Sequence, residues 1–353
     1  MKKFFVSILL VLGLPLLGAL AWIYGGWSEL HRRSYSDLSP EQFHRFQVPK
    51  GIHLGDVIIS LGGERTESDL FLMIRLARFS RISQIKAGFY QLSESGSLHE
   101  HLTKISQGKV AQGKLTVVEG WNRWQVREAW ERDGWLEAKE FDRLCDDTEL
   151  LEEFQLPGKD CEGFLFPETY LFSYGIAPKE IFRALYGKYK AVLSVVSTEA
   201  GTFGPLNLSE LEFVTLASII EKETGQAKER PRIACVFYNR LRSKPPWRLE
   251  TDPTVIYAAR LSDPEFDGNL KGYHLRKMNH PYNTYLNKGL PPGPIANVSL
   301  DAMQAVITPE KCGDFFFVSK NNGEHIFCPT LSCHNRAVQR WQVNYFRRKK
   351  KNL

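Results

Sequence analysis

Residues Ser209 to Gly225 read SELEFVTLASIIEKETG and contain the clearest helix signal in the chain. Ser209 is followed three residues later by Glu212, which is the capping-box pattern that starts a helix. The interior, LEFVTLASII, is apolar, and Gly225 is the expected stop. A helix over 209–224 is therefore the firmest element from which to work outward.

Two carboxylates stand near the end of this predicted helix. Glu221 has Ala217 one turn back, and Glu223 has Ile219 one turn back, so both have apolar neighbours. Such surroundings penalise the charged form of a carboxyl and raise its pKa, which is what a general acid needs near neutral pH. Periodicity alone does not choose between the two.

Residues two apart on a helix do not face each other, so these glutamates cannot act as a facing pair. Any second carboxylate must come from elsewhere, and Glu250 and Asp252 are the nearest candidates. The alternative is that both glutamates are helix-end residues paired with Lys222 or Arg230.

The rest of the chain predicts an α+β protein with a small module at 47–110 and a larger mixed domain at 111–346. Asn321-Asn322-Gly323 separates FFFVSK from EHIFC and predicts a β-hairpin there. Further strands are expected at 86–92 and at LTVVEG, 115–120. Further helices are expected at 54–61, 69–79, 97–107, 123–132, 137–145, 179–195, 229–242, 253–260, 300–307 and 333–346.

The first residues predict a transmembrane anchor at 1–28, followed by a linker at 29–46. Lys2 and Lys3 precede an uncharged run, Phe4 to Ser28, that is long enough to span a bilayer as a helix. The far end carries an aromatic cluster, Trp22, Tyr24 and Trp27. We expect a cytoplasmic N-terminus. A cleaved signal peptide ending at Ala19-Leu20-Ala21 is the alternative, and both readings export the bulk of the chain.

The composition is that of a globular protein, with 43% hydrophobic and 24% charged residues among 353. Its six cysteines include no CxxC pair, so one or two disulfides are expected in an oxidising compartment. Cys235 lies among apolar residues and is expected to be a buried free thiol. The alternative, a zinc site at Cys312, Cys328, Cys333 and His334, has spacings that fit no common pattern.

The net charge is +6, and the chain ends in a basic tail at 347–353. The tail is either a solvated end or an attraction to an anionic surface. Nucleic acid is not expected as a partner, because no DNA-reading or ribonucleoprotein motif is found. The chain also lacks GxxxxGK, GxGxxG, HExxH and GxSxG, which argues against nucleotide-dependent enzymes, zincins and common serine hydrolases. No cofactor or metal is expected.

Six stretches in order resemble the endolytic murein transglycosylase family, also called YceG-like. They are VVEGWN (117–122), EGFLFPETY (162–170), ASIIEKETG (217–225), VFYNRL (236–241), TDPTVIYA (251–258) and YNTYLNKGLPPGPIAN (282–297). The resemblance covers about 47–345. It implies a LysM-like module at 47–110, a catalytic domain on the outer (periplasmic) side of the plasma (inner) membrane, and a single-pass anchor.

The resemblance also implies the chemistry. The glutamate of the family's EKET block falls on Glu221, which becomes the catalytic residue and removes the ambiguity with Glu223. The implied reaction cleaves the MurNAc–GlcNAc bond of peptidoglycan internally, leaves 1,6-anhydro-MurNAc ends and limits nascent strand length. One carboxyl gives its proton to the glycosidic oxygen and takes one from the C6 hydroxyl, which attacks C1. An intramolecular nucleophile has a large effective concentration, so no second carboxylate is required.

Glycan contacts are expected from aromatic faces and from amide, hydroxyl and carboxyl groups. The expected substrate-binding residues are Asn283, Tyr285, Tyr170, Glu168, Thr251 and Asp252. Two departures from the family pattern are Glu250, where the family often has Gln, and His280 before PYNTY. The resemblance also suggests peptidoglycan synthases (penicillin-binding proteins) as partners.

Three alternatives remain open. A hydrolase would use the same site with water as nucleophile and a second carboxylate to activate it, and Glu250 keeps this reading in view. A catalytically silent cell-wall scaffold would bind glycan without cleaving it. A pyridoxal-phosphate lyase would need a Schiff-base lysine in a cytoplasmic phosphate pocket, which an exported chain without an obvious phosphate loop argues against.

Overall fold

The protein is described here by a computed structural model. It describes residues 2–32, 38–39, 43, 45–62, 66–82, 84–197, 202–345 and 347, without the side chains of 2–14 and 62. The chain forms two compact units, Met1–Lys114 with Leu171–Ile176, and Leu115–Tyr170 with Ala177–Leu353. Both contain helices and short strands, as expected for an α+β protein. The predicted five-part division of the chain stays a prediction.

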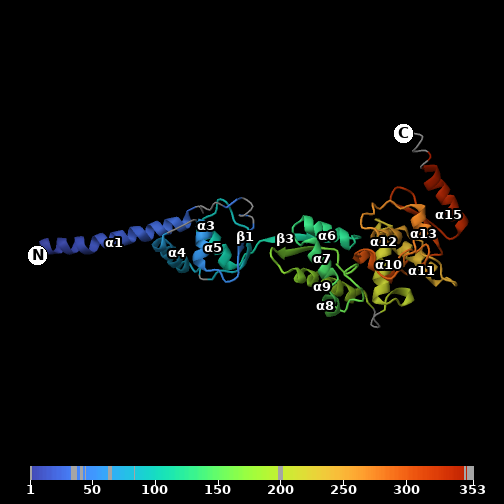
Figure 1. Cartoon of the computed structure of the whole chain (residues 1–353), viewed down its shortest axis with the longest axis horizontal. Coiled ribbons are helices and arrows are strands. Elements are labelled where there is room, and N and C mark those ends of the chain that lie inside the picture. The colour runs from blue at the N-terminus through green and yellow to red at the C-terminus, as the bar shows by residue number, and fades with distance from the viewer. Residues whose placement is uncertain are drawn as a thin grey trace. The chain divides into compact units, whose positions relative to one another are not determined.

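The first unit is built on a small antiparallel sheet and three helices (Figure 1). Its elements after the N-terminal helix are β1 (Phe46–Val48), α3 (Leu54–Gly62), α4 (Glu67–Phe79), β2 (Gly88–Tyr90) and α5 (Leu98–Gln107). β1 pairs with β2 so that Phe46 lies opposite Tyr90. The expected capping box of Ser97 and Glu100 is present, and Gly108 ends α5 in the left-handed conformation. These predictions are confirmed.

The N-terminal helix α1 runs over Lys2–His31 and includes Pro15. Its last turns pack on α4 and α5, and Leu30 is fully buried in the core of the unit. Among the described residues, no helix has the length and apolarity needed to cross a bilayer. The membrane anchor at 1–28 therefore stays a prediction, and much of the predicted linker (33–37, 40–42 and 44) lies outside the described residues.

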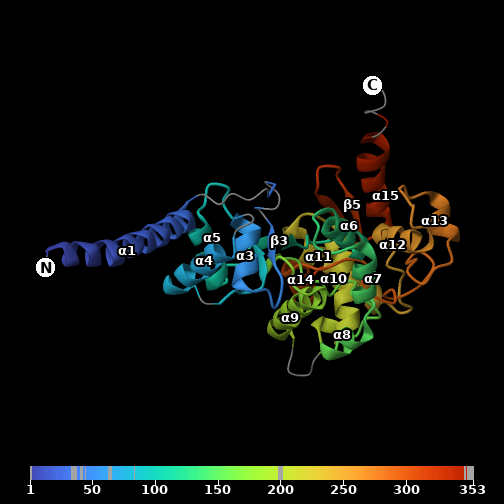
Figure 2. The same ribbon diagram turned by 60° about the vertical axis from the view of Figure 1, so that its left-hand side comes forward.

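The second unit is mainly helical (Figures 1 and 2). Its elements, with the pair β3–β4 on which the two units border, are β3 (Gln112–Thr116), α6 (Arg123–Arg132), α7 (Ala138–Cys145), α8 (Thr148–Glu153), β4 (Thr169–Ser173), α9 (Pro178–Val196), η1 (Gly204–Leu206), α10 (Glu210–Glu223), η2 (Ala227–Glu229), α11 (Arg230–Arg242), α12 (Asp252–Ser262), α13 (Gly272–Lys277), α14 (Leu300–Ile307), β5 (Phe316–Ser319), β6 (His325–Cys328), α15 (Leu331–Val338) and η3 (Gln339–Val343). β5 and β6 form the expected hairpin.

Helix α10 is the central helix of the second unit. Its capping box of Ser209 and Glu212 is present, as expected. Every residue from Phe213 to Glu221 is buried, because α11, α12 and α14 all pack against it. A helix enclosed on all sides needs the apolar sequence seen here. Figure 2 shows α10, α11 and α14 side by side.

Three disulfides fix the second unit: Cys145–Cys161, Cys235–Cys312 and Cys328–Cys333. The expectation of a free thiol at Cys235 is wrong, because its partner arrives from a segment remote in sequence. These bonds also use the sulfurs that the alternative zinc site needs. No cysteine is left free.

Several element boundaries differ from the prediction. β3 ends at Thr116, whereas a strand was expected to reach Gly120, whose left-handed φ of +72° turns the chain. The last helix stops at Val338 and continues as a π-helical turn, Gln339–Val343. β4 was not predicted. Residues 346 and 348–353, with most of the basic tail, lie outside the described residues.

Candidate active site

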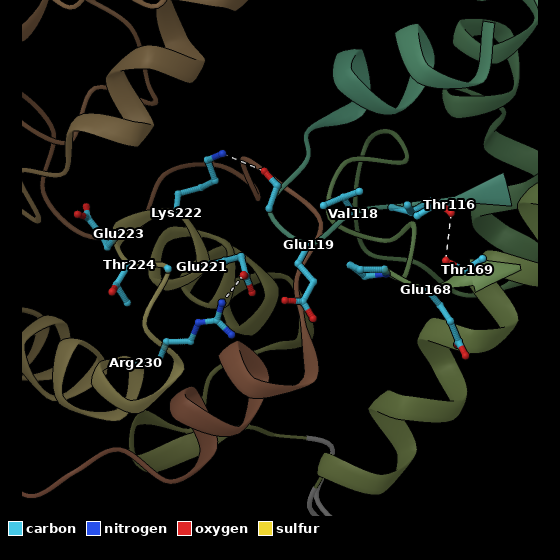
Figure 3. A pocket seen from close by; sticks show the side chains of 14 residues that line it. Thr116, Val118, Glu119, Glu168, Thr169, Glu221, Lys222, Glu223, Thr224 and Arg230 are labelled. Carbon is cyan, nitrogen blue, oxygen red and sulfur yellow. Dashed lines mark hydrogen bonds and ion pairs between the residues drawn. The ribbon is translucent and has the colours of Figure 1, made fainter. Parts of the chain in front are cut away.

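A pocket of about 670 Å³ lies in the second unit beside the end of α10 (Figure 3). One wall is formed by Glu221–Gly225 and Arg230, and the other by Thr116–Gly120 and Pro167–Thr169. The pocket therefore joins three of the sequence blocks that carry the family resemblance, namely VVEGWN, EGFLFPETY and ASIIEKETG.

Glu221 lies in the first wall with both carboxyl oxygens engaged. Oε1 accepts a hydrogen bond from Nη2 of Arg230 at 2.6 Å, and Oε2 accepts from the backbone N–H and the hydroxyl of Ser299 at 3.0 and 2.5 Å. The side chains of Glu221 and Arg230 are 4% and 6% exposed. This is the arrangement of an ionised, charge-assisted carboxylate.

The partners of Glu221 come from the starts of two helices. Arg230 is the first residue of α11, and Ser299 is the N-cap of α14, where its hydroxyl accepts from the N–H of Ala302 at 3.2 Å. Nη1 of Arg230 also donates to the Ser299 hydroxyl at 2.9 Å. That hydroxyl accepts two bonds, so its own proton is available for Glu221. The helix N-terminus adds a further favourable field for negative charge.

The alternative weighed from sequence, that Glu221 pairs with Arg230, is therefore confirmed as geometry. The pair nevertheless lines a pocket, so it is not only a helix-end contact. Ser299 gave no sequence signal, because it is remote from Glu221 in the chain.

The second wall approaches Glu221 closely at Gly120. A Cβ atom at Gly120 would lie 3.6 Å from Cγ of Glu221 and 3.7 Å from Cδ of Lys222. The N–H of Gly120 donates to the carbonyl of Asn297 at 2.9 Å, and its carbonyl accepts from Nζ of Lys222 at 2.9 Å. The left-handed backbone at Gly120 favours glycine at this position.

Asn297 fixes this wall from inside the protein. Its fully buried amide donates to the carbonyl of Trp121 at 2.9 Å and accepts from the N–H of Leu165 at 3.0 Å. A single side chain thus joins the VVEGWN, EGFLFPETY and YNTYLNKGLPPGPIAN blocks. The pocket wall is rigid because each of these bonds is buried or partly buried.

Glu119 extends from the second wall into the pocket, toward the Glu221–Arg230 pair (Figure 3). Among the described residues, no hydrogen bond or ion pair reaches its carboxyl. The pocket partly removes this carboxyl from water, which raises the pKa of Glu119 above its ordinary value, and the negative charge of Glu221 raises it further. Arg230 acts in the opposite direction. The sequence search for a second carboxylate missed Glu119, although it lies in a quoted block.

Glu223 points away from Glu221, as the helical spacing requires (Figure 3). Burial raises the pKa of Glu223 to about 7, with a further increase from the charge of Asp252 and a decrease from Arg240. Burial also lowers the pKa of Lys222, while Glu221 raises it. Each of these groups has neighbours different from those of Glu221, so the two glutamates of EKET are chemically distinct.

Of the six residues expected to bind substrate, Glu168 lies in the pocket lining. Its carboxyl is paired with Lys188 at 2.8 Å. Tyr170 follows it, and its hydroxyl donates to the carbonyl of Phe166 at 2.7 Å. Burial raises the pKa of Tyr170 well above its usual range.

The other expected contacts lie outside that lining. Asn283 is fully buried and its amide donates to three carbonyls, those of His274, Leu275 and Met278. Thr251 is buried, and its N–H donates to the hydroxyl of Thr284 at 3.0 Å. The Tyr285 hydroxyl donates to Asp252 at 2.7 Å. Asp252 and Glu250, the carboxylates first considered as partners of Glu221, do not line the pocket.

A second pocket of about 420 Å³ shares Lys222 with the first. Its walls include Trp124, Ile256 and Tyr257, with Gln125 and other polar groups beside them. The rings of Trp124 and Tyr257 lie 5.1 Å apart. Aromatic and polar groups in one hollow suit a sugar, which has apolar faces and hydroxyl edges.

Within the described part of the chain, no group of three or more His, Cys, Asp or Glu side chains is arranged to hold a metal ion. The pocket instead offers carboxyl groups, a guanidinium and an ammonium. These groups suit proton transfer to and from a bound substrate.

The fold and the pocket define a protein with two carboxyls on facing walls. A profile of the YceG-like family matches residues 46–340, and the chain belongs to this family.

Three curated relatives and one solved structure support the assignment. The chain is 32% identical to the endolytic murein transglycosylase of Bacillus subtilis (strain 168), over 75% of each chain. It is 26% identical to the endolytic murein transglycosylase of Streptococcus pneumoniae (strain D39), over 96% of this chain and 65% of that protein. A crystal structure of a yceG-like protein from Listeria monocytogenes is 29% identical, with a TM-score of 0.53, over 82% of this chain and 97% of that one.

Proposed function

We propose that Glu221 is the catalytic carboxyl of a lytic transglycosylase that cleaves peptidoglycan glycan strands internally. The chain is a lyase that acts on peptidoglycan, in agreement with the names of its curated relatives. The observation that carries the assignment of Glu221 is its position in a pocket wall, buried and held by Arg230 and Ser299. A carboxyl oriented by such partners is suited to a fixed role in proton transfer.

The reaction breaks the bond between C1 of MurNAc and the oxygen of the following GlcNAc. The C6 hydroxyl of the same MurNAc attacks C1, loses its proton and closes a 1,6-anhydro ring. The leaving oxygen gains a proton, so one proton is taken up and one released, and no water is consumed. Glu221, which is oriented by Arg230, is the base that accepts the C6 proton.

The family resemblance implies that one carboxyl performs both proton transfers. That scheme requires Glu221 to begin the reaction as a carboxylic acid. Its two oxygens already accept hydrogen bonds from Arg230 and Ser299, an arrangement suited to the base form. The source of the proton for the leaving oxygen is considered in the next section.

Glycan binding is proposed for both pockets. Glu168 and Thr169 offer polar groups in the first, and Trp124 and Gln125 in the second. Because Lys222 lines both, one strand extending from the first pocket to the second would present an internal bond for cleavage. Asn283, Thr251, Asp252, Tyr285 and Tyr170 remain predictions as glycan contacts, and their hydrogen bonds also give them a role in supporting loops.

We place the catalytic unit on the outer side of the plasma membrane, anchored by residues 1–28. Three disulfides in the second unit support folding in an oxidising compartment. The uncharged run from Phe4 to Ser28 supports the anchor. The LysM-like role of 47–110 and the partnership with peptidoglycan synthases belong to the same proposal.

The experiment is digestion of purified peptidoglycan by the full chain in detergent, with products identified by mass spectrometry. Wild type should give internal cuts with 1,6-anhydro-MurNAc ends. Glu221→Gln should reduce the rate by roughly 10³-fold or more, because the substitution removes the proton acceptor. Glu210→Gln is the matched control, since it makes the same change on α10 at a carboxyl paired with Lys190 outside the pocket.

Two outcomes contradict the proposal. Reducing ends in place of anhydro ends would mean that water is the nucleophile and the chain is a hydrolase. Equal cleavage by Glu221→Gln and Glu210→Gln would mean that Glu221 is not the catalytic group.

A further inference from the structure

The pocket contains a second carboxyl, Glu119, whose position is fixed by its neighbour. Gly120 is bonded to Asn297 on one side and to Lys222 on the other, and it lies against the side chain of Glu221. The backbone at Glu119 is therefore held one residue from the catalytic wall. Its side chain extends into the pocket from the side opposite α11 and α14 (Figure 3).

The two carboxyls differ in their partners. Glu221 accepts bonds from a guanidinium, a hydroxyl and a backbone N–H. Glu119 has no hydrogen-bonded or ion-paired partner among the described residues, and it faces the pocket. A cation and a helix N-terminus stabilise the negative form of the first carboxyl, whereas nothing comparable stabilises that of the second.

Different environments for two carboxyls in one site identify the acid and the base. The partial burial of Glu119 and the charge of Glu221 raise the pKa of Glu119, so its acid form persists to higher pH than that of an ordinary carboxyl. The other charged groups facing Glu119 are Arg230, which acts in the opposite direction, and Asp301, which adds to the increase.

We propose that Glu119 is a further catalytic residue, the general acid that protonates the leaving GlcNAc oxygen, while Glu221 is the base for the C6 hydroxyl. The inference rests on the proposed transglycosylase function and divides its two proton transfers between two groups. The proton leaves Glu119 as the C1–O bond breaks with its electron pair going to oxygen. The C6 oxygen forms the new bond to C1, and its proton passes to Glu221.

After product leaves, Glu221 carries a proton and Glu119 carries a negative charge. Exchange with solvent returns both to their starting states, so protons and charge balance over a cycle. No metal, oxidant or further reactant is needed.

The test compares two substrates for the full chain in detergent. One is a peptidoglycan glycan oligomer, and the other is a glycan oligomer ending in MurNAc with a 4-nitrophenyl group in place of the leaving sugar. A nitrophenolate leaves without protonation, so a variant that lacks only the acid should recover on this substrate. Glu119→Gln should lose roughly 10²- to 10⁴-fold on the natural oligomer and much less on the aryl substrate.

Glu221→Gln should be slow on both substrates, because the C6 hydroxyl still needs a base. The pH–rate profile of wild type should fall on its alkaline side as Glu119 loses its proton, and Glu119→Gln should lack that limb. Glu210→Gln should match wild type throughout. Circular dichroism of each variant separates loss of folding from loss of chemistry.

The proposal is overturned if Glu119→Gln cleaves the natural oligomer at the wild-type rate, or if it loses the same factor on both substrates. In the first case an inactive Glu221→Gln would still support the proposed function with a single carboxyl. Activity of Glu221→Gln on both substrates would contradict the proposed function itself.

Discussion

The two walls of the pocket carry the same side chain in opposite settings. On the α10 wall, Glu221 is buried and bonded to Arg230 and Ser299. On the facing wall, Glu119 has a carboxyl without a cation bonded to it among the described residues. The residue type alone therefore says little about the task. What distinguishes the two glutamates is which donors the fold brings to each.

A third glutamate shows what burial does away with the pocket. Glu162 is 3% exposed, and its Oε2 accepts from the N–H of Arg123 and the hydroxyl of Tyr257. Burial raises the pKa of Glu162 to about 8. The series Glu221, Glu119 and Glu162 thus runs from a paired carboxyl, through an open one, to one enclosed without a bonded cation.

The largest expected effect on stability comes from breaking the Glu221–Arg230 pair. Arg230→Leu leaves a buried carboxylate without its cation, and we expect a loss of about 3–5 kcal/mol in the free energy of unfolding. The double variant Arg230→Leu/Glu221→Leu should recover most of it. Chemical denaturation of the full chain in detergent measures both.

Arg183→Leu is the control for that prediction. Its guanidinium pairs with Glu153 and Glu180 at the surface, so the loss should be below about 1 kcal/mol. If Arg230→Leu is no less stable than this control, the two walls do not differ in the way described.

Glu162 gives a smaller, pH-dependent effect. Its pKa of about 8 in the folded state exceeds that of the unfolded chain, so the stability it contributes is complete at low pH and is lost as pH rises toward 8. Glu162→Gln removes this loss. The melting temperature of the variant minus that of wild type should therefore increase from pH 5 to pH 8.5, by on the order of a few kcal/mol in free energy. A constant difference would mean that Glu162 is not enclosed as described.

The smallest expected effect concerns the second pocket. Trp124→Ala should raise KM for long glycan strands by roughly 3- to 10-fold, about 0.5–1.5 kcal/mol, with kcat nearly unchanged. Phe79→Ala is the control, because Phe79 is 82% exposed in the first unit. A fall in kcat with unchanged KM would place Trp124 in support of the catalytic wall, not of the strand.

Much of the fold could be predicted from local patterns. The capping boxes of Ser97 and Ser209 marked the starts of α5 and α10, and the Asn-Gly turn marked the β5–β6 hairpin. These signals are local, since each depends on residues a few positions apart. Glu221 was located on α10 in the same way, and its assignment over Glu223 came from the family resemblance.

The site itself depends on contacts that local patterns do not report. Ser299 and Gly120 are remote from Glu221 in sequence, yet both lie against it. The same limit led to the wrong expectation for Cys235, whose partner is 77 residues away. Loop composition likewise marked Asn283 as a polar loop residue without showing that its amide points inward, to three carbonyls.

The most direct test of the divided roles is a crystal structure of Glu221→Gln with a bound glycan oligomer that spans the cleavage site. The account predicts the scissile glycosidic oxygen within hydrogen-bonding reach of Glu119 and the C6 hydroxyl of MurNAc facing residue 221. A strand bound away from this pocket, or a glycosidic oxygen that contacts residue 221 with Glu119 remote from it, would contradict the assignment of acid and base to the two walls.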